Sequence, residues 1–326
     1  MTNINDVAHL AGVSRGSVSN YLNGAKMRAV TAKKIAQAIA ELDYLPNGTA
    51  QALKKKQTRY AVLILPEINT PFFADLTEKI QAEFRKKDFS LILCTSNNQS
   101  ALEIKYLKMA QVQKVAGIIT MSYSDIRPWL NANIPLVTLE HSLTEQVPLV
   151  TSDNYTGGRI ASQKLRALGA KKLLFLGTKP IENSSWERRQ GFLDDCELHQ
   201  CTAQQMLLSA NNSLAMLKDF VNDNFSPSKN NFDGIFAEND AVAYSCWRIL
   251  QQKNISIPAQ VQIIGFDGAP CYGNQPLLLS SIKQPTSLLA KAAVENLFNL
   301  IKHSPISNKK ILPVSFVEGI TTKETL

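Results

Sequence analysis

The sequence predicts a small all-α head followed by an α/β core of two doubly wound, parallel-sheet subdomains. Apolar residues recur at helical spacing before residue 60, whereas strand-length apolar runs alternate with helical patterns after it. The chain has 326 residues, of which 44% are hydrophobic, and this is enough to form packed cores in two or three domains. We therefore expect a globular protein whose two regions belong to different structural classes.

Three short helices account for the apolar pattern of the head. Only Gly12-Val13-Ser14 separates the first two, and so tight a connection forces the steep crossing of a helix-turn-helix, with Val13 and Val18 filling the angle. The helical positions are Ile4, Val7, Ala8 and Ala11, then Val18, Tyr21 and Leu22, then Ile35, Ile39 and Leu42.

Capping residues predict where each of these helices begins and ends. Asn, Ser and Thr side chains accept hydrogen bonds from the first turn of a helix, and Gly or Asn ends the last turn. The first helix is expected between Asn3 and Gly12, with Asp6 in its third position. The second is expected between Ser14 and Asn23-Gly24, and the third between Thr31 and Asp43-Tyr44-Leu45-Pro46.

The core contains strand-length runs that are apolar on both faces, which is typical of parallel sheets covered by helices on both sides. About ten strands are too many for one comfortable open sheet, so two subdomains with a ligand cleft between them are expected. The expected strands are 60–66, 90–96, 116–122, 134–140, 148–153, 171–177, 232–238, 261–267 and 311–317. The expected helices are 73–88, 100–113, 155–168, 185–198, 240–252 and 286–302.

A short linker separates the two regions. Residues 47–59 could form about two helical turns, too few for a stable isolated helix in water, so they should fold only when supported. The sequence therefore predicts a helix-turn-helix domain at 1–46, a hinge at 47–59 and a core at 60–326.

Charge is concentrated in the first 60 residues, which carry nine Lys or Arg against three acidic residues, while the other 266 residues carry 26 against 24. A basic head on a nearly neutral body indicates a polyanionic partner, although a merely soluble basic N-terminus would look the same. The N-terminus lacks the pattern of a signal peptide and no apolar stretch reaches roughly 18 residues, so we expect a cytoplasmic protein that does not enter a membrane.

Catalytic, cofactor and metal sites are not expected. The four histidines are scattered, and the motifs G-x-S-x-G, H-E-x-x-H and G-x-G-x-x-G after a strand do not occur. The five cysteines lack paired C-x-x-C spacing, so neither a disulfide framework nor a zinc site is predicted. These observations favour a binding protein over an enzyme.

The head resembles the LacI/GalR bacterial transcription regulators in INDVAHLAGVSRGSVSNYLNG and in the following VTAKKIAQAIAELDYLPNGTAQAL. Later segments resemble the same family: LPEINTPFFADL, SDNYTGGRIASQKLRALGAKKLLFLG, ERRQGF, FAENDAVA and IPAQVQIIGFD. The resemblance implies a DNA-binding head, a hinge helix and a core similar to periplasmic sugar-binding proteins, with three crossovers between its subdomains. It also implies a repressor that binds a pseudopalindromic double-stranded operator as a homodimer, under allosteric control by a small molecule in the cleft.

In this family the second helix of the head enters the major groove. Arg15 can form a bidentate pair with guanine and Asn20 with adenine, although Arg15 could also be only a solvated surface charge. The sequence departs from the family at Asn20, where Arg is usual, and at Gly16, which offers no side chain. The residues implied in DNA binding are Arg15, Gly16 and Asn20 for bases, and Ser14, Ser17, Ser19 and Asn23 for phosphate contacts and capping.

The resemblance also assigns roles in the hinge. Leu53 matches the leucine that inserts into a central minor-groove step, and Ala50 supplies a small residue near the groove floor. Gln51 replaces a frequent Arg, and Lys54 to Lys56 could compensate for the lost phosphate contact. Leu53 could instead be a linker residue that covers the junction between head and core.

For the cleft, the resemblance implies that Arg188, Asn239 and Asp267 bind the hydroxyls or carboxylates of an effector, most simply a sugar or sugar derivative. Each has a plainer alternative, because Arg188 could pair with Glu187 or Asp194, Asn239 could cap a helix and Asp267 could cap a turn. The family often has His at position 170 and an acid at 268, where this chain has Ala170 and Gly268. Weaker candidates are Asn69, Phe73 and Glu140, with Trp186 or Trp247 stacking on a sugar.

A solute-binding protein of the periplasmic sugar-binding type is the alternative function, because the core alone fits it. Such a protein would require export and would have no use for the basic head. Removal of residues 1–60 separates the two, since a regulator would then keep ligand binding and lose DNA binding. The sequence leaves open whether the effector induces or co-represses, and whether dimers pair into tetramers.

Overall fold

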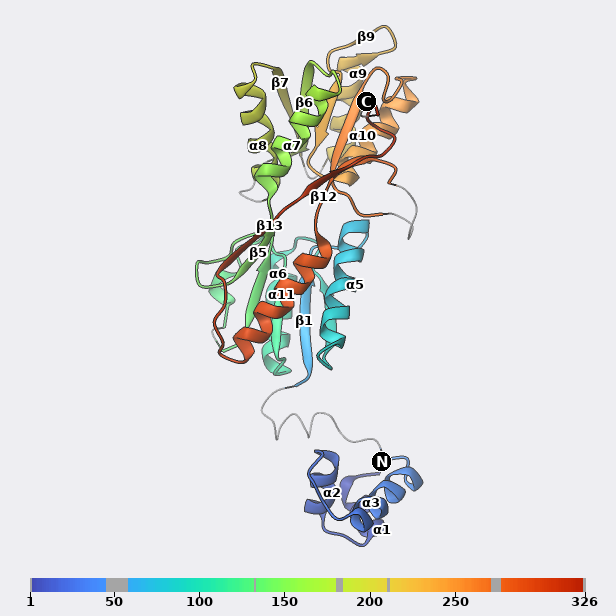
Figure 1. Ribbon diagram of the computed structural model, residues 1–326, viewed down its shortest axis with the longest axis vertical. Helices are drawn as coiled ribbons and strands as arrows, with labels where there is room; N and C mark the ends of the chain where they lie inside the picture. Colours follow the sequence, from blue (N-terminus) through green and yellow to red (C-terminus); the bar gives the residue numbers. More distant parts are fainter. Residues whose placement is uncertain are drawn as a thin grey trace. The chain divides into compact units, whose positions relative to one another are not determined.

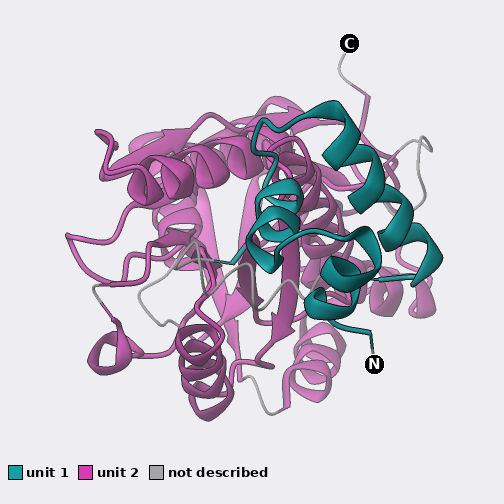
Figure 2. Ribbon diagram, turned by 90° about the horizontal axis from the view of Figure 1, so that it is seen from below, with its two compact units in different colours: residues 1–58 teal, residues 59–326 magenta. Residues whose placement is uncertain are grey.

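The computed structural model describes residues 2–44, 58–131, 133–179, 184–209, 212–270 and 277–324. The chain divides into two compact units, residues 1–58 and 59–326, coloured separately in Figure 2.

The first unit is a three-helix head whose capping groups match the predicted ones at α1 and α2. Its helices are α1 (Ile4–Ala11), α2 (Arg15–Leu22) and α3 (Ala29–Glu41). Asn3 Oδ1 accepts the Asn5 N–H at 2.8 Å, while the Asn3 N–H donates to Asp6 at 2.8 Å, which completes a capping box. Gly12 ends α1 in the left-handed conformation at φ 63°. The predicted boundaries of the first two helices are therefore confirmed.

The predicted start of the third helix at Thr31 is wrong. Helix α3 begins three residues earlier, with Arg28 rather than Thr31 at the cap position, because Arg28 adopts an extended backbone and its carbonyl accepts the Ala32 N–H at 3.0 Å. Thr31 thus lies within the first turn, and no side chain caps this end of α3. Packing in the core of the head stabilises α3 without a cap. Val7 of α1, Val18 of α2 and Ile35 of α3 are fully buried in one cluster.

The second unit contains two six-stranded sheets, drawn one above the other in Figure 1. The first sheet has the order β13-β5-β4-β3-β1-β2 and is parallel throughout. Its strands are β1 (Tyr60–Leu65), β2 (Ser90–Thr95), β3 (Gly117–Thr120), β4 (Leu136–Leu139), β5 (Leu149–Ser152) and β13 (Lys309–Leu312). With it lie helices α5 (Pro71–Arg85), α6 (Ser100–Val112) and α11 (Thr286–Ile301), and the short η1 (Arg127–Trp129).

The second sheet has the order β14-β12-β11-β10-β6-β7, in which β14 alone runs antiparallel to its neighbour. Its strands are β6 (Lys172–Thr178), β7 (Thr202–Leu208), β10 (Gly234–Ala237), β11 (Gln262–Asp267), β12 (Ser280–Lys283) and β14 (Ser315–Val317). With it lie α7 (Asn154–Ala167), α8 (Ser184–Leu198), α9 (Ser213–Asn224) and α10 (Asp240–Gln252), and the hairpin β8 (Phe225–Ser226) to β9 (Lys229–Asn230).

Both sheets are buried on both faces, as the apolar runs predict. In β1, Leu63 packs into the cluster that includes α5 and α11, whereas the next residue, Ile64, packs into the cluster that includes α6. The predicted α/β class with two parallel-sheet subdomains is confirmed. We call the part built on the first sheet the N-terminal half and the part built on the second the C-terminal half.

The chain crosses between the halves three times. It crosses after β5 into α7, after β12 into α11, and after β13 into β14. One run predicted as a single strand, 311–317, is in fact the third crossing: it divides at residues 313–314, and its two ends join different sheets. The polar edge strand β7, the serine-rich β12 and helix α9 were not predicted, because their burial depends on distant partners.

Candidate functional site

Helix α2 presents one polar face to solvent. Arg15, Gly16 and Asn20 are exposed, while Val18 on the opposite side is fully buried in the head. This is the arrangement that a recognition helix needs, because the apolar side anchors it and the polar side is free to enter a groove. The three residues predicted to read bases therefore share one accessible face.

Residues predicted for phosphate contact also shape the ends of α2. Ser14 caps the helix by accepting the Ser17 N–H at 3.1 Å, and the two hydroxyls lie 3.0 Å apart. The Asn23 amide donates to the Ser19 carbonyl at 2.6 Å and so closes the last turn. The predicted hinge residues Ala50 and Leu53, together with Gln51 and Lys54 to Lys56, lie outside the described residues.

In the second unit, two glycines bring α7 and α8 into backbone contact. A Cβ on Gly158 would lie 2.0 Å from the Arg188 carbonyl oxygen, and one on Gly191 would lie 2.0 Å from the Tyr155 carbonyl oxygen. Only residues without a side chain permit this approach. The contact sets the position of Arg188 against the start of α7.

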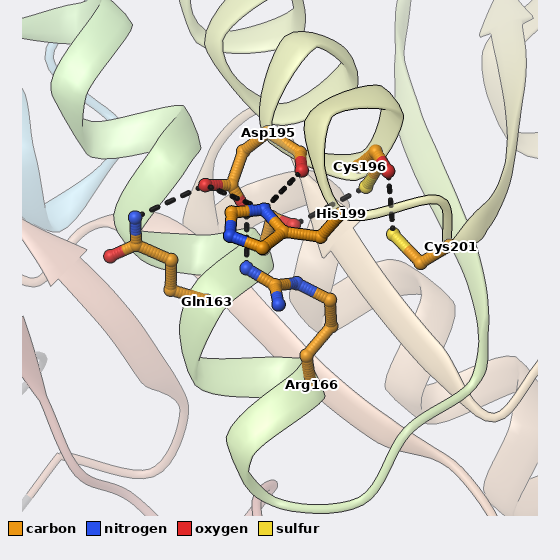
Figure 3. A network of polar contacts seen from close by, with 7 residues as sticks. Gln163, Arg166, Asp195, Cys196, His199 and Cys201 are labelled. Carbon is orange, nitrogen blue, oxygen red and sulfur yellow. Dashed lines mark hydrogen bonds and ion pairs between the residues drawn. The ribbon is translucent and has the colours of Figure 1, made fainter.

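A buried polar network ties the far ends of the same two helices together (Figure 3). Asp195 on α8 accepts from Arg166 at 2.8 Å and from Gln163 at 3.1 Å, both on α7. Burial acts to raise the pKa of Asp195, but hydrogen bonds from Arg166, Ser162 and Gln163 outweigh it and hold this pKa below its usual value. The network therefore favours an ionised Asp195 and links α8 to α7.

Arg188 is a buried arginine at the end of the C-terminal half that faces the crossings. Its Nε donates to Asn154 Oδ1 at 2.8 Å, its Nη1 donates to the Glu238 carbonyl at 2.8 Å, and its guanidinium lies 3.6 Å from the centre of the Phe266 ring. Its hydrogen-bond partners are thus Asn154 and the Glu238 carbonyl, rather than Glu187 or Asp194 as the plainer alternative proposed. These contacts hold a planar cationic donor in a single orientation.

Glu140 directly follows β4 in the N-terminal half, whereas Arg188 belongs to the C-terminal half. Its carboxylate accepts the Ser152 N–H at 2.8 Å and the Asn154 amide at 2.9 Å, and the residue is buried. Its backbone is left-handed at φ 61°, which turns the chain away immediately after the strand. Since Asn154 also binds Arg188, Glu140 and Arg188 share one bridging amide.

Asp267, at the end of β11, carries an unusually basic carboxyl group. Burial raises its pKa to about 6, while the nearby Arg188 lowers it. Its neighbour Asp240 also has a raised pKa, because of burial and then the charge of Asp267, and it accepts the Ser281 hydroxyl at 2.6 Å. Asp267 has a backbone φ of 126°, a strained value of the kind that concentrates at functional sites.

Side chains across the crossings link the halves at this point. Gln284 receives the Ser152 hydroxyl at 2.7 Å and donates to Asp267 at 2.8 Å. Thr286, at the start of α11, donates to Asp75 of α5 at 2.5 Å. The second crossing is therefore pinned both to β5 and to the side chain of Asp267.

The sequence reasoning missed Tyr123, Asn154, Ser184 and Gln284. Tyr123 follows β3, and burial and then the charge of Glu140 raise its pKa to about 12, while Arg188 and a hydrogen bond with Ser184 act in the opposite direction. Each lies close to the end of a strand or at the start of a helix, so strand-end position was a usable signal.

The remaining predicted residues lie in other settings. Asn239 caps α10 by accepting the Val242 N–H at 2.9 Å, as its plainer alternative proposed. Asn69 is exposed in the loop before α5, and Phe73 packs edge to face on Phe72 against the N-terminal core. Trp247 packs on the C-terminal core, whereas Trp186 is 40% exposed and lines a cavity.

Gly268 has a structural reason to be glycine. Its φ is 61°, and a Cβ here would lie 2.6 Å from the Lys283 Cα. Any side chain would therefore push β12 away from β11. Within the described ranges, no cluster of three His, Cys, Asp or Glu side chains suits a metal, and no helix is long and apolar enough to span a membrane.

Comparison with known proteins assigns both units. Residues 3–47 match the bacterial regulatory proteins of the lacI family, and residues 58–317 match the periplasmic binding proteins and sugar binding domain of the LacI family. The chain belongs to the LacI family. The second match spans most of the chain, so membership does not depend on the head alone.

Two curated LacI-family relatives align with nearly the full chain. The sucrose operon repressor of Streptococcus mutans serotype c is 31% identical, covering 97% of this chain and 98% of the relative. The ribose operon repressor of Bacillus subtilis strain 168 is 31% identical, covering 99% of each. Both relatives are named as repressors, not enzymes.

A solved structure is similar over most of this chain. It is a periplasmic binding protein/LacI transcriptional regulator from Alkaliphilus metalliredigens QYMF, complexed with D-xylulofuranose. It is 30% identical with a TM-score of 0.72, covering 82% of this chain and 100% of that chain.

Proposed function

We propose that this LacI-family chain is a transcriptional repressor that binds double-stranded operator DNA as a homodimer and is controlled by a sugar. The observation that carries the proposal is the site at the crossings, called here the effector site: Glu140 of the N-terminal half and Arg188 and Asp267 of the C-terminal half. This ligand class is supported by two relatives named as sucrose and ribose operon repressors and by a similar structure that was solved with D-xylulofuranose. Carboxylates and a guanidinium suit ring hydroxyls, which both donate and accept.

The sugar acts by favouring one arrangement of the two halves. A ligand held by groups from both halves binds best when they are correctly spaced, and it shifts the population toward that spacing by its difference in affinity. The halves are joined by three chain crossings, so they can rotate without unfolding. Residues 45–57 connect the N-terminal half to the head, and through them the rotation changes the separation of two heads in a dimer.

DNA recognition is assigned to the exposed face of α2. Arg15 reads guanine and Asn20 reads adenine in the major groove, while Ser14, Ser17, Ser19 and Asn23 position the helix on the phosphates. Gly16 leaves room on this face, since the nearest atom to an added Cβ is Ser14 Oγ at 3.7 Å. In the hinge, outside the described residues, Leu53 and Ala50 are assigned to the minor groove.

Selection of binding sites from random duplexes tests this assignment. Arg15→Ala is expected to relax the preference at one position in each half-site, at a cost of about 1 to 3 kcal/mol. Lys302→Ala is the matched control, because it removes one exposed positive charge from the second unit. An Arg15→Ala protein that selects the wild-type sequence with undiminished preference would reject the assignment, as would wild-type protein without preference for any symmetric duplex.

The proposal assigns no catalytic residue, no cofactor and a cytoplasmic location, where operator DNA is found. A binding site of this kind releases its ligand unchanged. Sugars incubated with the protein and recovered should therefore be chemically identical to those added, as measured by mass spectrometry and chromatography. Any protein-dependent conversion that survives repurification would contradict this part of the proposal.

A further inference from the structure

A cavity lies beside Glu140 of the effector site. It has a volume of about 340 Å³, near the lower end of the roughly 300 to 1,000 Å³ usual for small-molecule sites. The residues that line it include Glu140, Ser142, Ser184, Trp186, Glu187 and Lys309. We call this space the side cavity.

The side cavity shares Glu140 with the effector site. Glu140 lines the side cavity and also binds Asn154, the residue that holds Arg188. Ser184 lines it too and is hydrogen-bonded with Tyr123. A ligand that contacts Glu140 therefore lies next to both the effector site and the side cavity.

The charges of the side cavity select against anions. Its lining holds two carboxylates, Glu140 and Glu187, and the basic side chain of Lys309, with His141 beside them. Burial raises the pKa of Glu187, the charges of Lys309 and Arg188 lower it, and the charge of Glu140 raises it. A phosphate or carboxylate would add to this negative charge, whereas neutral hydroxyl groups can donate to both carboxylates.

The remaining lining suits a sugar ring. Trp186 is 40% exposed, so it offers an aromatic surface against which the C–H face of a ring can pack. Ser142 and Ser184 provide hydroxyls that both donate and accept. An apolar face flanked by carboxylates and hydroxyls is the lining that an uncharged glycosyl unit requires.

We propose that the effector is a neutral saccharide of at least two rings, one in the effector site and the next packed on Trp186 in the side cavity, with Glu187 accepting its hydroxyls. This inference rests on the proposed function, since it specifies the ligand of the same site. The second ring touches both halves: Lys309 belongs to β13 in the N-terminal half, and Trp186 and Glu187 belong to α8 in the C-terminal half. The larger ligand thus stabilises one arrangement of the halves more strongly than a single ring does.

Isothermal titration calorimetry of the full-length protein tests the inference. The probes are sucrose, maltose, trehalose, cellobiose and lactose, with D-glucose, D-fructose, D-galactose and D-ribose as single rings and sucrose 6-phosphate as the charged comparison. At least one neutral disaccharide is expected to bind about tenfold or more tightly than its component hexoses, which corresponds to about 1.4 kcal/mol. Trp186→Ala should remove this gain and leave the affinity for single rings within about twofold of wild type.

Two further variants separate stacking and charge from general damage. Trp129→Ala removes a tryptophan of similar exposure, 44%, from η1, and it should leave the disaccharide affinity unchanged. Glu187→Gln keeps the side-chain shape but removes the negative charge. It should lower the affinity for the neutral disaccharide several-fold and reduce the ratio of this affinity to the affinity for sucrose 6-phosphate. Thermal unfolding of each variant confirms that it is folded before titration.

The outcomes distinguish this inference from the function on which it rests. A single-ring sugar that binds and changes operator affinity, when no disaccharide binds more tightly, overturns the side cavity and leaves the proposed function standing. Equal losses for one-ring and two-ring sugars in Trp186→Ala overturn the side cavity as well, as does tighter binding of sucrose 6-phosphate by wild type. Failure of every saccharide in the panel to bind overturns both.

Discussion

The contact between α7 and α8 makes Gly158 a sharp test of how Arg188 is positioned. Replacing Gly158 with Ala places a Cβ 2.0 Å from the Arg188 carbonyl oxygen and 2.8 Å from the Phe192 nitrogen. Real Cβ atoms essentially never approach closer than 3.0 Å, so the helices must separate by about 1 Å. Both obstructing atoms belong to the backbone and cannot rotate aside.

The cost follows from two opposing contributions. Overpacking of a close-packed interface costs about 1 to 3 kcal/mol and occasionally more, and a rigid backbone contact lies at the upper end. Alanine gains up to about 1 kcal/mol over glycine within a helix. The free energy of unfolding should therefore fall by about 2 kcal/mol. Since the displaced residue is Arg188, its 2.8 Å hydrogen bond to Asn154 should weaken, and sugar affinity should fall by about tenfold or more.

Urea unfolding followed by circular dichroism measures the first effect, and calorimetric titration of the bound sugar measures the second. Gly16→Ala is the matched control: it is also a helical glycine, but an added Cβ there meets only Ser14 Oγ, at an ordinary van der Waals distance of 3.7 Å, so the head should gain stability. Unfolding of Gly158→Ala within about 0.5 kcal/mol of wild type, with unchanged sugar affinity, would refute the close-packing argument.

Two further predictions concern the head and the pH dependence of the core. Val18→Ala truncates a fully buried side chain and should destabilise the head by about 1 to 3 kcal/mol. It should therefore lower operator affinity and make the head more susceptible to limited proteolysis, whereas Val30→Ala, at a 71% exposed site, should do neither. Equal behaviour of the two variants would contradict the assigned core of the head. Burial raises the pKa of Asp267 to about 6 in the folded protein, whereas the pKa of this group in the unfolded chain is near 4. The stability that protonated Asp267 provides is therefore complete below about pH 4 and is lost as the pH rises through 6. The free energy of unfolding should fall by at most about 3 kcal/mol over this range. Asp267→Asn should remove this loss in urea unfolding between pH 4.5 and 7.5, with exposed Asp223→Asn as control, and an unaltered pH dependence would count against a buried carboxyl group.

The local chemistry of the chain determined most of its secondary structure. The ends of α1 and α2 could be predicted because Asn3, Gly12 and Ser14 act on backbone groups within a few residues. The start of α3 could not, because there the tertiary core, rather than a cap, decides which residues are helical. The long apolar strands were predictable for a related reason: burial on both faces leaves a continuous signal in the sequence.

Only the tertiary structure decided how the polar groups combine. Glu140, Asn154 and Arg188 lie on different elements, and the bridging amide between them exists because Gly158 and Gly191 let α7 and α8 touch. The division of 311–317 into strands of two sheets was hidden for the same reason, since each end is stabilised by partners far away in the sequence. The sequence thus determined the helices, the strands and the residue types suited to DNA and sugar, because these depend on near neighbours. The site itself depends on non-local packing, which brings together residues that no spacing rule connects.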